Sequence, residues 1–325
     1  MLGNGNKKLE VNFVIFYLKS IILKKMNQKT DFKLLFCLVV VAIVWGTTYF
    51  GIRVAVETIP PWYITSMRQG LASLIVLCVL LYKRELSWIG WKNFKYQFVP
   101  AILMIVIANG FTTIAEKNVP SGLTSILSAL SPVVIFIGSI LFRLQKPSIK
   151  GFVGVIIGFL GVVFIFRDGL GAILEPNYKT GIMFLSIAIL SWSVGTVYSK
   201  IHIHKSNNIA LNLFYQFAIA AIIQLFLALI FSPNVDVSLW SFRSIFATLY
   251  LAIFGSVLAF FCYLYALKRV TAIQVSILNY INTIIAVFLG WLFLDEVITS
   301  DFIIATALII LGVFIINYKK KEIQR

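Results

Sequence analysis

The chain has 325 residues and a formal net charge of +16, yet 60% of its residues are hydrophobic, 12% are charged and the mean hydropathy is +0.95. A water-soluble protein of this size has no core that could hold so much apolar sequence, so lipid must be the solvent for most of the surface. The composition therefore excludes a soluble domain. It also argues against a nucleic-acid partner, because the basic residues fall in loops between apolar runs.

Ten apolar runs of about 20 residues, the length that a helix needs to cross a bilayer, follow one another along the chain. They are apolar on all faces, whereas the strands of a membrane barrel alternate apolar and polar residues. The sequence predicts an all-α integral membrane protein with ten transmembrane helices. The predicted spans are residues 34–52, 62–82, 98–115, 123–142, 149–166, 181–198, 209–231, 245–267, 272–294 and 302–318.

The basic residues predict how the chain is inserted. Nineteen Lys and Arg residues lie on one set of alternate loops and tails, and five lie on the other set. Since basic loops stay in the cytoplasm, we expect both termini there, in a multi-pass protein of the inner (plasma) membrane. Two cytoplasmic termini require an even number of spans, which ten satisfies.

The predicted tails are cytoplasmic, residues 1–33 at the N-terminus and the basic residues 319–325 at the C-terminus. Residues 11–23 are apolar, but Lys19 interrupts them and they are too short to cross. No small-residue cleavage site follows, so an interfacial helix or a disordered tail is favoured over a cleaved signal. A third hypothesis is that translation naturally begins at Met26, which would make the preceding residues non-native.

The chain also repeats itself. An offset of 151 aligns residues 101–165 with 252–316 without a gap, and an offset of 147 continues towards the N-terminus, where Trp45 meets Trp192. The predicted repeats therefore hold five spans each, an odd number, so the second enters the membrane from the opposite side. Inverted repeats of this kind are typical of transporters that alternate access to a site near the midplane.

Two motifs carry a family resemblance. The first is WGTTYFGIR at 45–53, followed by Ile59-Pro60-Pro61 and Arg68-Gln69; the second is AEKNVPSGL at 115–123, continuing to Ser131-Pro132. With the ten-span duplication, they resemble the EamA branch of the drug/metabolite transporter superfamily, with one EamA repeat over 34–166 and a second over 181–318.

The resemblance implies export of small metabolites, commonly amino acids or related compounds, without ATP hydrolysis. The chain carries no phosphate loop of the Walker type, in agreement with that. Two departures from the family pattern make the halves less symmetric. Gln145 stands where a glutamate often ends the fourth span, and Thr283 faces Pro132 under the 151 offset.

Polar residues inside a membrane are costly and are functional candidates by default. Arg68 lies about two turns into its span, as a cation in a cavity or as a side chain that reaches back towards Glu57. A cavity arginine would attract a substrate carboxylate or phosphate.

Pro132 supplies a second candidate, because it cannot donate to the carbonyl of Ser128 and leaves that oxygen free beside the hydroxyls of Ser128 and Ser131. The offset of 151 relates these serines to Asn279 and Asn282. The alternative role for all four is hydrogen bonding between helices, worth about 0.6 kcal/mol per pair. The full predicted substrate site is Trp45, Tyr49, Arg68, Gln69, Asn109, Ser128, Ser131, Trp192, Gln216, Asn279 and Asn282.

The energy source stays open at this stage. Proton coupling needs a buried carboxylate, whereas the acidic residues, Glu116 among them, fall near the ends of spans. Uniport or exchange therefore fits as well as proton antiport. We expect no metal or cofactor, and as partners a small-molecule substrate and membrane lipid. Gly154 and Gly158 permit close helix contact, within the bundle or between the two copies of a homodimer.

Two other functions compete with metabolite transport. One is a flippase for amphipathic or lipid-linked molecules, which a lateral opening between helices would favour. The other is a membrane-bound enzyme, and it is the weaker alternative because the sequence has no His with a spaced Asp, no acidic pair within a span and no metal motif.

Overall fold

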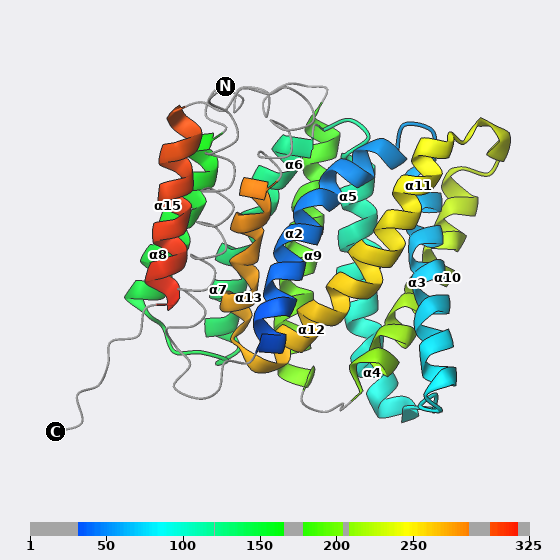
Figure 1. Cartoon of the computed structure of the whole chain (residues 1–325), viewed down its shortest axis with the longest axis horizontal. Coiled ribbons are helices and arrows are strands. Elements are labelled where there is room, and N and C mark those ends of the chain that lie inside the picture. The colour runs from blue at the N-terminus through cyan, green and yellow to red at the C-terminus, as the bar shows by residue number, and fades with distance from the viewer. Residues whose placement is uncertain (1–31, 120, 166–177, 204–207, 286–299, 318–325) are drawn as a thin grey trace, which may run out of the picture.

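A computed structural model describes the chain apart from residues 1–31, 120, 166–177, 204–207, 286–299 and 318–325 (Figure 1). Its described residues form helices and no strands. The predicted N-terminal tail with Met26, and the basic C-terminal tail, lie almost wholly outside the described residues. The first-half helices are α2 (Phe32–Ala55), α3 (Pro61–Tyr82), α4 (Gly90–Pro100), η1 (Ala101–Asn109), α5 (Gly110–Ala115), α6 (Ser121–Ser128), α7 (Ser131–Leu141) and α8 (Ile149–Ile165).

The second half continues in the same way, with an interruption of the helix Ala272–Ile285 at Ile277. Its helices are α9 (Lys179–His202), α10 (Ile209–Phe231), the 3₁₀ turn η5 (Val237–Leu239), α11 (Phe242–Tyr250), η6 (Leu251–Leu258), α12 (Ala259–Arg269), α13 (Ala272–Ser276) and α15 (Ser300–Asn317). Both η1 and η6 are π-helical and run without a break into the α-helices on either side.

Six of the described helices are long and apolar enough to cross a membrane: Phe32–Ala55, Pro61–Tyr82, Gly90–Ala115, Lys179–His202, Ile209–Phe231 and Phe242–Arg269. Four shorter apolar helices, Ser131–Leu141, Ile149–Phe164, Ala272–Ile285 and Ala307–Ile316, overlap the four remaining predicted spans. The all-helical membrane fold is confirmed, and the count of ten crossings stays a prediction.

Local sequence explains where several helices begin. Pro61 occupies the first turn of α3, where its missing N–H costs no hydrogen bond. The Asn208 side chain accepts from the backbone N–H of Leu211 at the start of α10. Thr271 and Gln274 form a reciprocal capping box at the start of α13.

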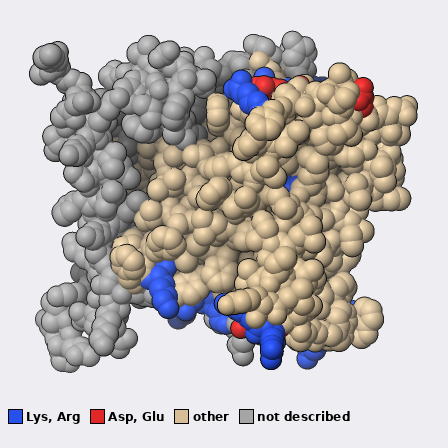
Figure 2. All heavy atoms as spheres, turned by 45° about the vertical axis from the view of Figure 1, so that its right-hand side comes forward, with Lys and Arg blue, Asp and Glu red and all other residues tan. Residues whose placement is uncertain are grey.

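The surface between the two ends of the bundle is apolar. Leu141, Ile222 and Phe226 are each more than 60% exposed. Figure 2 shows almost all of the visible Lys, Arg, Asp and Glu side chains at two opposite ends, with a broad belt of other residues between them. An apolar belt of this kind suits hydrocarbon rather than water.

The helices pack in pairs that involve both halves of the chain. At one edge α3 runs along α10, and at the other α8 runs along α15 (Figure 1). Between these edges α2 packs against α12, and η1 packs against α9. The site described below lies among these central helices.

Glycines set the distance between α8 and α15. A Cβ atom added to Gly312 would lie 2.5 Å from the Gly154 carbonyl oxygen and 2.5 Å from the Gly158 nitrogen. The backbones are therefore in direct contact, as small residues allow between membrane helices. Of the two predicted uses of Gly154 and Gly158, the structure shows close contact within the bundle.

We expect Gly312→Ala to destabilise the protein, because its Cβ would meet backbone atoms that cannot rotate away. Overpacking of this kind costs about 1–3 kcal/mol. The control is Gly70→Ala, whose Cβ would make only an ordinary contact with Ala221 at 3.9 Å. Thermal unfolding in detergent should show a lower Tm for Gly312→Ala alone, and equal Tm values for both variants would contradict the packing described.

Candidate functional site

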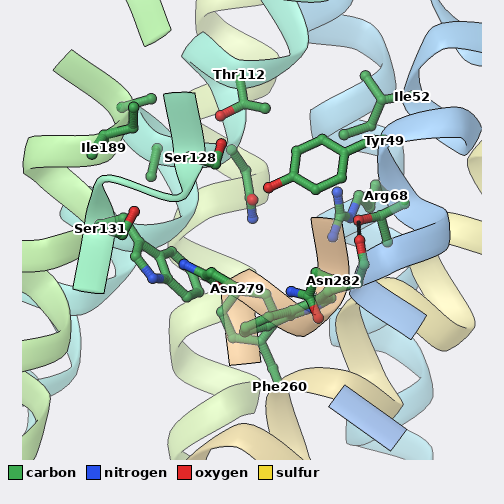
Figure 3. A pocket seen from close by; sticks show the side chains of 16 residues that line it. Tyr49, Ile52, Arg68, Thr112, Ser128, Ser131, Ile189, Phe260, Asn279 and Asn282 are labelled. Atoms are coloured by element: carbon green, nitrogen blue, oxygen red, sulfur yellow. Dashed lines mark hydrogen bonds between the residues drawn. The ribbon is translucent and has the colours of Figure 1, made fainter. Parts of the chain in front are cut away.

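A cavity of about 90 Å³ lies among the central helices. Segments from both halves line it, including α2, α3, η1, α9 and the interrupted helix Ala272–Ile285. In Figure 3, Tyr49 and Arg68 face Ser128 and Ser131 across the cavity. The structure brings nine of the eleven predicted site residues to it: Trp45, Tyr49, Arg68, Asn109, Ser128, Ser131, Trp192, Asn279 and Asn282.

Arg68 is the cation of this cavity. Its side chain is 3% exposed, and its Nε donates to the Ser256 hydroxyl at 2.8 Å. Within the described part of the chain, its two terminal nitrogens have no hydrogen-bond partner. Of the two predicted roles, the structure therefore shows the cavity cation, and Glu57 is exposed in the turn after α2. A guanidinium placed this way can bind an anion through its outer edge.

The two π-helical segments position polar groups at the cavity. Gly255 and Ser256 lie on η6, where the Gly255 carbonyl accepts from the Trp45 indole at 3.2 Å and Ser256 accepts from Arg68. Asn109 ends η1 and lines the cavity, and its amide nitrogen is buried without a partner among the described residues. The wider turn of a π-helix changes which side chains face inward, and such segments often occur at functional sites.

Interrupted helices supply the remaining polar groups. Between α6 and α7 the helix breaks at 129–130, just before Pro132, and Ser128 and Ser131 flank the break. This is the break that the proline predicts. In the second half the interruption at Ile277 occurs without a proline, and Asn279 follows it. Both breaks therefore bring paired polar residues to one cavity, as broken transporter helices do.

Asn282 also has a structural role. In the orientation that satisfies its neighbours, its amide nitrogen donates to the carbonyls of Leu278 and Ala42, each at 2.9 Å. It thereby joins the helix Ala272–Ile285 to α2. Hydrogen bonding between helices, the alternative role predicted for this residue, accounts for its donor group.

An aromatic cluster borders the cavity on the side towards the start of α2. Its members are Trp45, Trp192, Phe260 and Tyr263, and the centroids of the two indole rings lie 5.1 to 5.9 Å from each other and from the other two rings. Tyr263 is further fixed by a 2.7 Å hydrogen bond with Thr196. Packed rings of this kind separate the cavity from that end of the bundle and offer an apolar wall to a ligand.

Arg53 and Glu116 meet at the other end of the site, where α2 and α5 end. Arg53 Nη1 donates to the backbone carbonyls of Glu116 and Lys117 at 2.6 and 3.0 Å. This cation at the C-terminus of α5 satisfies carbonyls that the helix leaves free. The Glu116 side chain is 0% exposed.

Gln69 and Gln216 do not line the cavity. Gln69 follows Arg68 on α3, and one residue turns a helix by about 100°, so its side chain is buried on another face of α3. Gln216 donates to Gln97 at 2.8 Å beside a second, smaller cavity, near the end of the bundle opposite Arg53. Both predictions depended on the residue's depth in the membrane, as inferred from its position in a predicted span. This depth does not specify which face of the helix is turned inward.

Several residues at the site were not predicted from the sequence. Thr48 and Thr112 line the cavity, and Ser256 holds Arg68. Thr112 could have been found from its spacing, since it lies three residues after Asn109 on the same helix face. Ser256 had no such signal, because only the packing of η6 against α3 places it beside Arg68.

Known transporters resemble this chain over most of its length. The EamA-like transporter family matches residues 32–167 and again residues 179–318. The chain belongs to the EamA-like transporter family. This membership makes it a membrane transporter with a small-molecule substrate and sets aside the enzyme alternative.

Relatives of the family extend over most of the chain. The uncharacterized transporter YoaV of Bacillus subtilis is 24% identical, covering 87% of this chain and 96% of YoaV. The uncharacterized inner membrane transporter YedA of Escherichia coli is 28% identical, covering 86% of this chain and 88% of YedA. The protein PagO of Salmonella typhimurium is 30% identical, covering 89% of this chain and 93% of PagO. A crystal structure of another protein has a TM-score of 0.72 at 19% identity, covering 87% of this chain and 96% of that one, a likeness of fold alone.

Ser256→Ala should destabilise the protein because it removes the acceptor of a buried, charged hydrogen bond, an interaction worth about 1.5–3 kcal/mol. A double-mutant cycle separates this bond from the loss of a hydroxyl. In an Arg68→Met background, which has no guanidinium, Ser256→Ala should cost much less. Thermal unfolding of the four proteins measures the difference, and additive effects would mean that the two side chains do not interact.

Proposed function

We propose that this EamA-like transporter exports a small metabolite that carries a carboxylate, such as an amino acid or a related compound, by alternating access across the inner membrane. The observation that carries the proposal is the placement of Arg68. Its guanidinium borders a buried polar cavity with its terminal nitrogens available to an anion. An isolated charge inside a membrane costs several kcal/mol. Reversible binding of a substrate anion would therefore give the buried guanidinium of Arg68 both a counter-ion and a function.

The proposed architecture is ten spans in two inverted repeats, with both termini in the cytoplasm. Three observations support the repeats. The family matches the chain twice, each time over one predicted half. The π-helical segments begin at Ala101 and Leu251, 150 residues apart, next to the 151 offset. Exchange of the halves also converts the α2–α12 pair into the α9–α5 pair, since α2 and α9 open the two repeats and the 151 offset relates α12 to α5.

The cavity favours a small zwitterionic or anionic substrate. Arg68 would bind its carboxylate, while Asn109, Ser128, Ser131 and Asn279 offer hydrogen bonds to its polar groups. The aromatic cluster offers an apolar wall to the rest of the molecule. A volume of about 90 Å³ is well below the roughly 300–1,000 Å³ of pockets that hold drug-sized ligands, which favours metabolites over lipid-linked molecules.

We expect Arg68→Gln to abolish or strongly reduce export, because the amide keeps hydrogen-bonding capacity and loses the charge that binds a carboxylate. The measurement is mass spectrometry of the medium of bacteria that express the wild-type chain, the variant or an empty vector, at matched levels of membrane protein. Arg243→Gln is the matched control, since Arg243 is exposed on α11, away from the cavity.

A compound class that accumulates outside with the wild type and the control, but not with Arg68→Gln, would support both the exporter and its site. If the compound accumulates equally with Arg68→Gln, the proposed export stands, but Arg68 is not part of the substrate site. A medium unchanged by the wild-type chain would count against export.

A further inference from the structure

Glu116 is a buried carboxylate that the site described above does not use. Its side chain is 0% exposed, and both carboxylate oxygens are buried without a hydrogen-bond partner in the described part of the chain. The backbone carbonyl of the same residue is bound by Arg53, but the side chain is not. A carboxylate in this environment has lost its water without gaining a donor, which disfavours the charged form.

The carboxyl group lies next to the cavity and in reach of its charges. Glu116 follows the cavity residue Thr112 by four residues, so the two share one helix face. Arg53 and Arg68 both act on the Glu116 carboxylate electrostatically, and Glu116 in turn acts on Tyr49. Glu116 therefore shares the field of the cation that would bind the substrate.

Several charged and titratable groups lie on the elements around Glu116. Those towards the Glu116 end of the bundle include Tyr49 and Arg53 on α2, Arg68 on α3, Lys179 at the start of α9, which packs against α5, and the adjacent Lys117. Lys117 and Lys179 are exposed. Glu116 is the first residue after the span Gly90–Ala115, and burial raises the pKa of its carboxyl well above the usual range, although Arg53 and Arg68 oppose this.

We propose that Glu116 is a proton-binding site of the transporter, and that it takes up a proton when the carboxylate of a substrate binds Arg68. The substrate anion neutralises Arg68 and so removes one of the two cations that stabilise the charged form of Glu116. The proton converts the carboxylate into a neutral carboxyl group. Proton and anion then favour each other's binding, as reciprocal linkage requires.

This inference rests on the proposed function, and it specifies the coupling that the sequence left open. A substrate anion would move together with one proton. Export would follow the metabolite's own gradient, and acid outside the cell would oppose it. Antiport would instead need the proton and the substrate to compete for one group, whereas here they bind two groups of opposite charge.

The first test needs no substrate. Infrared difference spectra of the purified full chain, recorded between acid and alkaline pH, detect the carbonyl stretch of a buried protonated carboxyl group. We expect the band in the wild type and its loss in Glu116→Gln. The control is Glu57→Gln, which removes an exposed carboxyl group and should keep the band. Glu116→Asp, which keeps a carboxyl group, should show a shifted band even if Glu116→Gln folds poorly. No band in the wild type, or an unchanged band in Glu116→Gln, would overturn the proposal.

The second test separates coupling from transport. Proteoliposomes are assayed for counterflow of single L-amino acids and for their uptake with and without an inward proton gradient. We expect the gradient to increase wild-type uptake several-fold and to leave Glu116→Gln uptake unchanged, while that variant retains counterflow. Wild-type counterflow with no response to the gradient would overturn the coupling and leave the proposed transport intact. If no amino acid shows counterflow, the proposed substrate class fails, and the infrared band still decides whether Glu116 binds a proton.

Discussion

Burial of a guanidinium among membrane helices is the constraint on which this structure depends. A charge in hydrocarbon costs several kcal/mol unless polar groups or water surround it. Arg68 meets that requirement with a bond to Ser256 and with a polar cavity at its outer edge. Ser256 comes from η6, and the cavity is lined by helices that break at 129–130, just before Pro132, and at Ile277. The irregular segments of both halves thus converge where the charge is, and irregular backbone at membrane depth is tolerated where it lines a cavity.

The sequence predicted the helical membrane fold because apolar runs of about 20 residues have few alternatives in a bilayer. It also predicted most of the cavity, since costly residues such as Arg68 and Asn109 mark an interior face. It could not predict the π-helical segments, because a π-helix changes the register of a helix without an apparent change of composition. Gln69 was misplaced for a related reason, as the face that a residue occupies depends on packing. Glu116 was assigned to a span end, and only the packing of α5 shows that it is buried.

The two ends of the site differ in kind. Towards the start of α2 the aromatic cluster closes the cavity with packed rings. Towards the end of α2 the contacts are polar, with Arg53 bound to the carbonyls that end α5 and Glu116 buried beneath them. Ring packing and charge-assisted hydrogen bonds can each be broken and reformed at a cost of a few kcal/mol. In an alternating-access account, these are the two contacts that would open in turn around Arg68.

The most direct test of that account asks from which side the cavity can be reached. Thr112→Cys places a thiol at the cavity in a chain whose Cys37, Cys78 and Cys262 are replaced by Ala. A thiol reagent that cannot cross membranes is then applied to right-side-out and to inside-out vesicles, and the labelled fraction is measured by mass spectrometry. Alternating access predicts labelling from both sides, because the same cavity opens to each side in turn. Labelling from one side alone would contradict alternating access at this site.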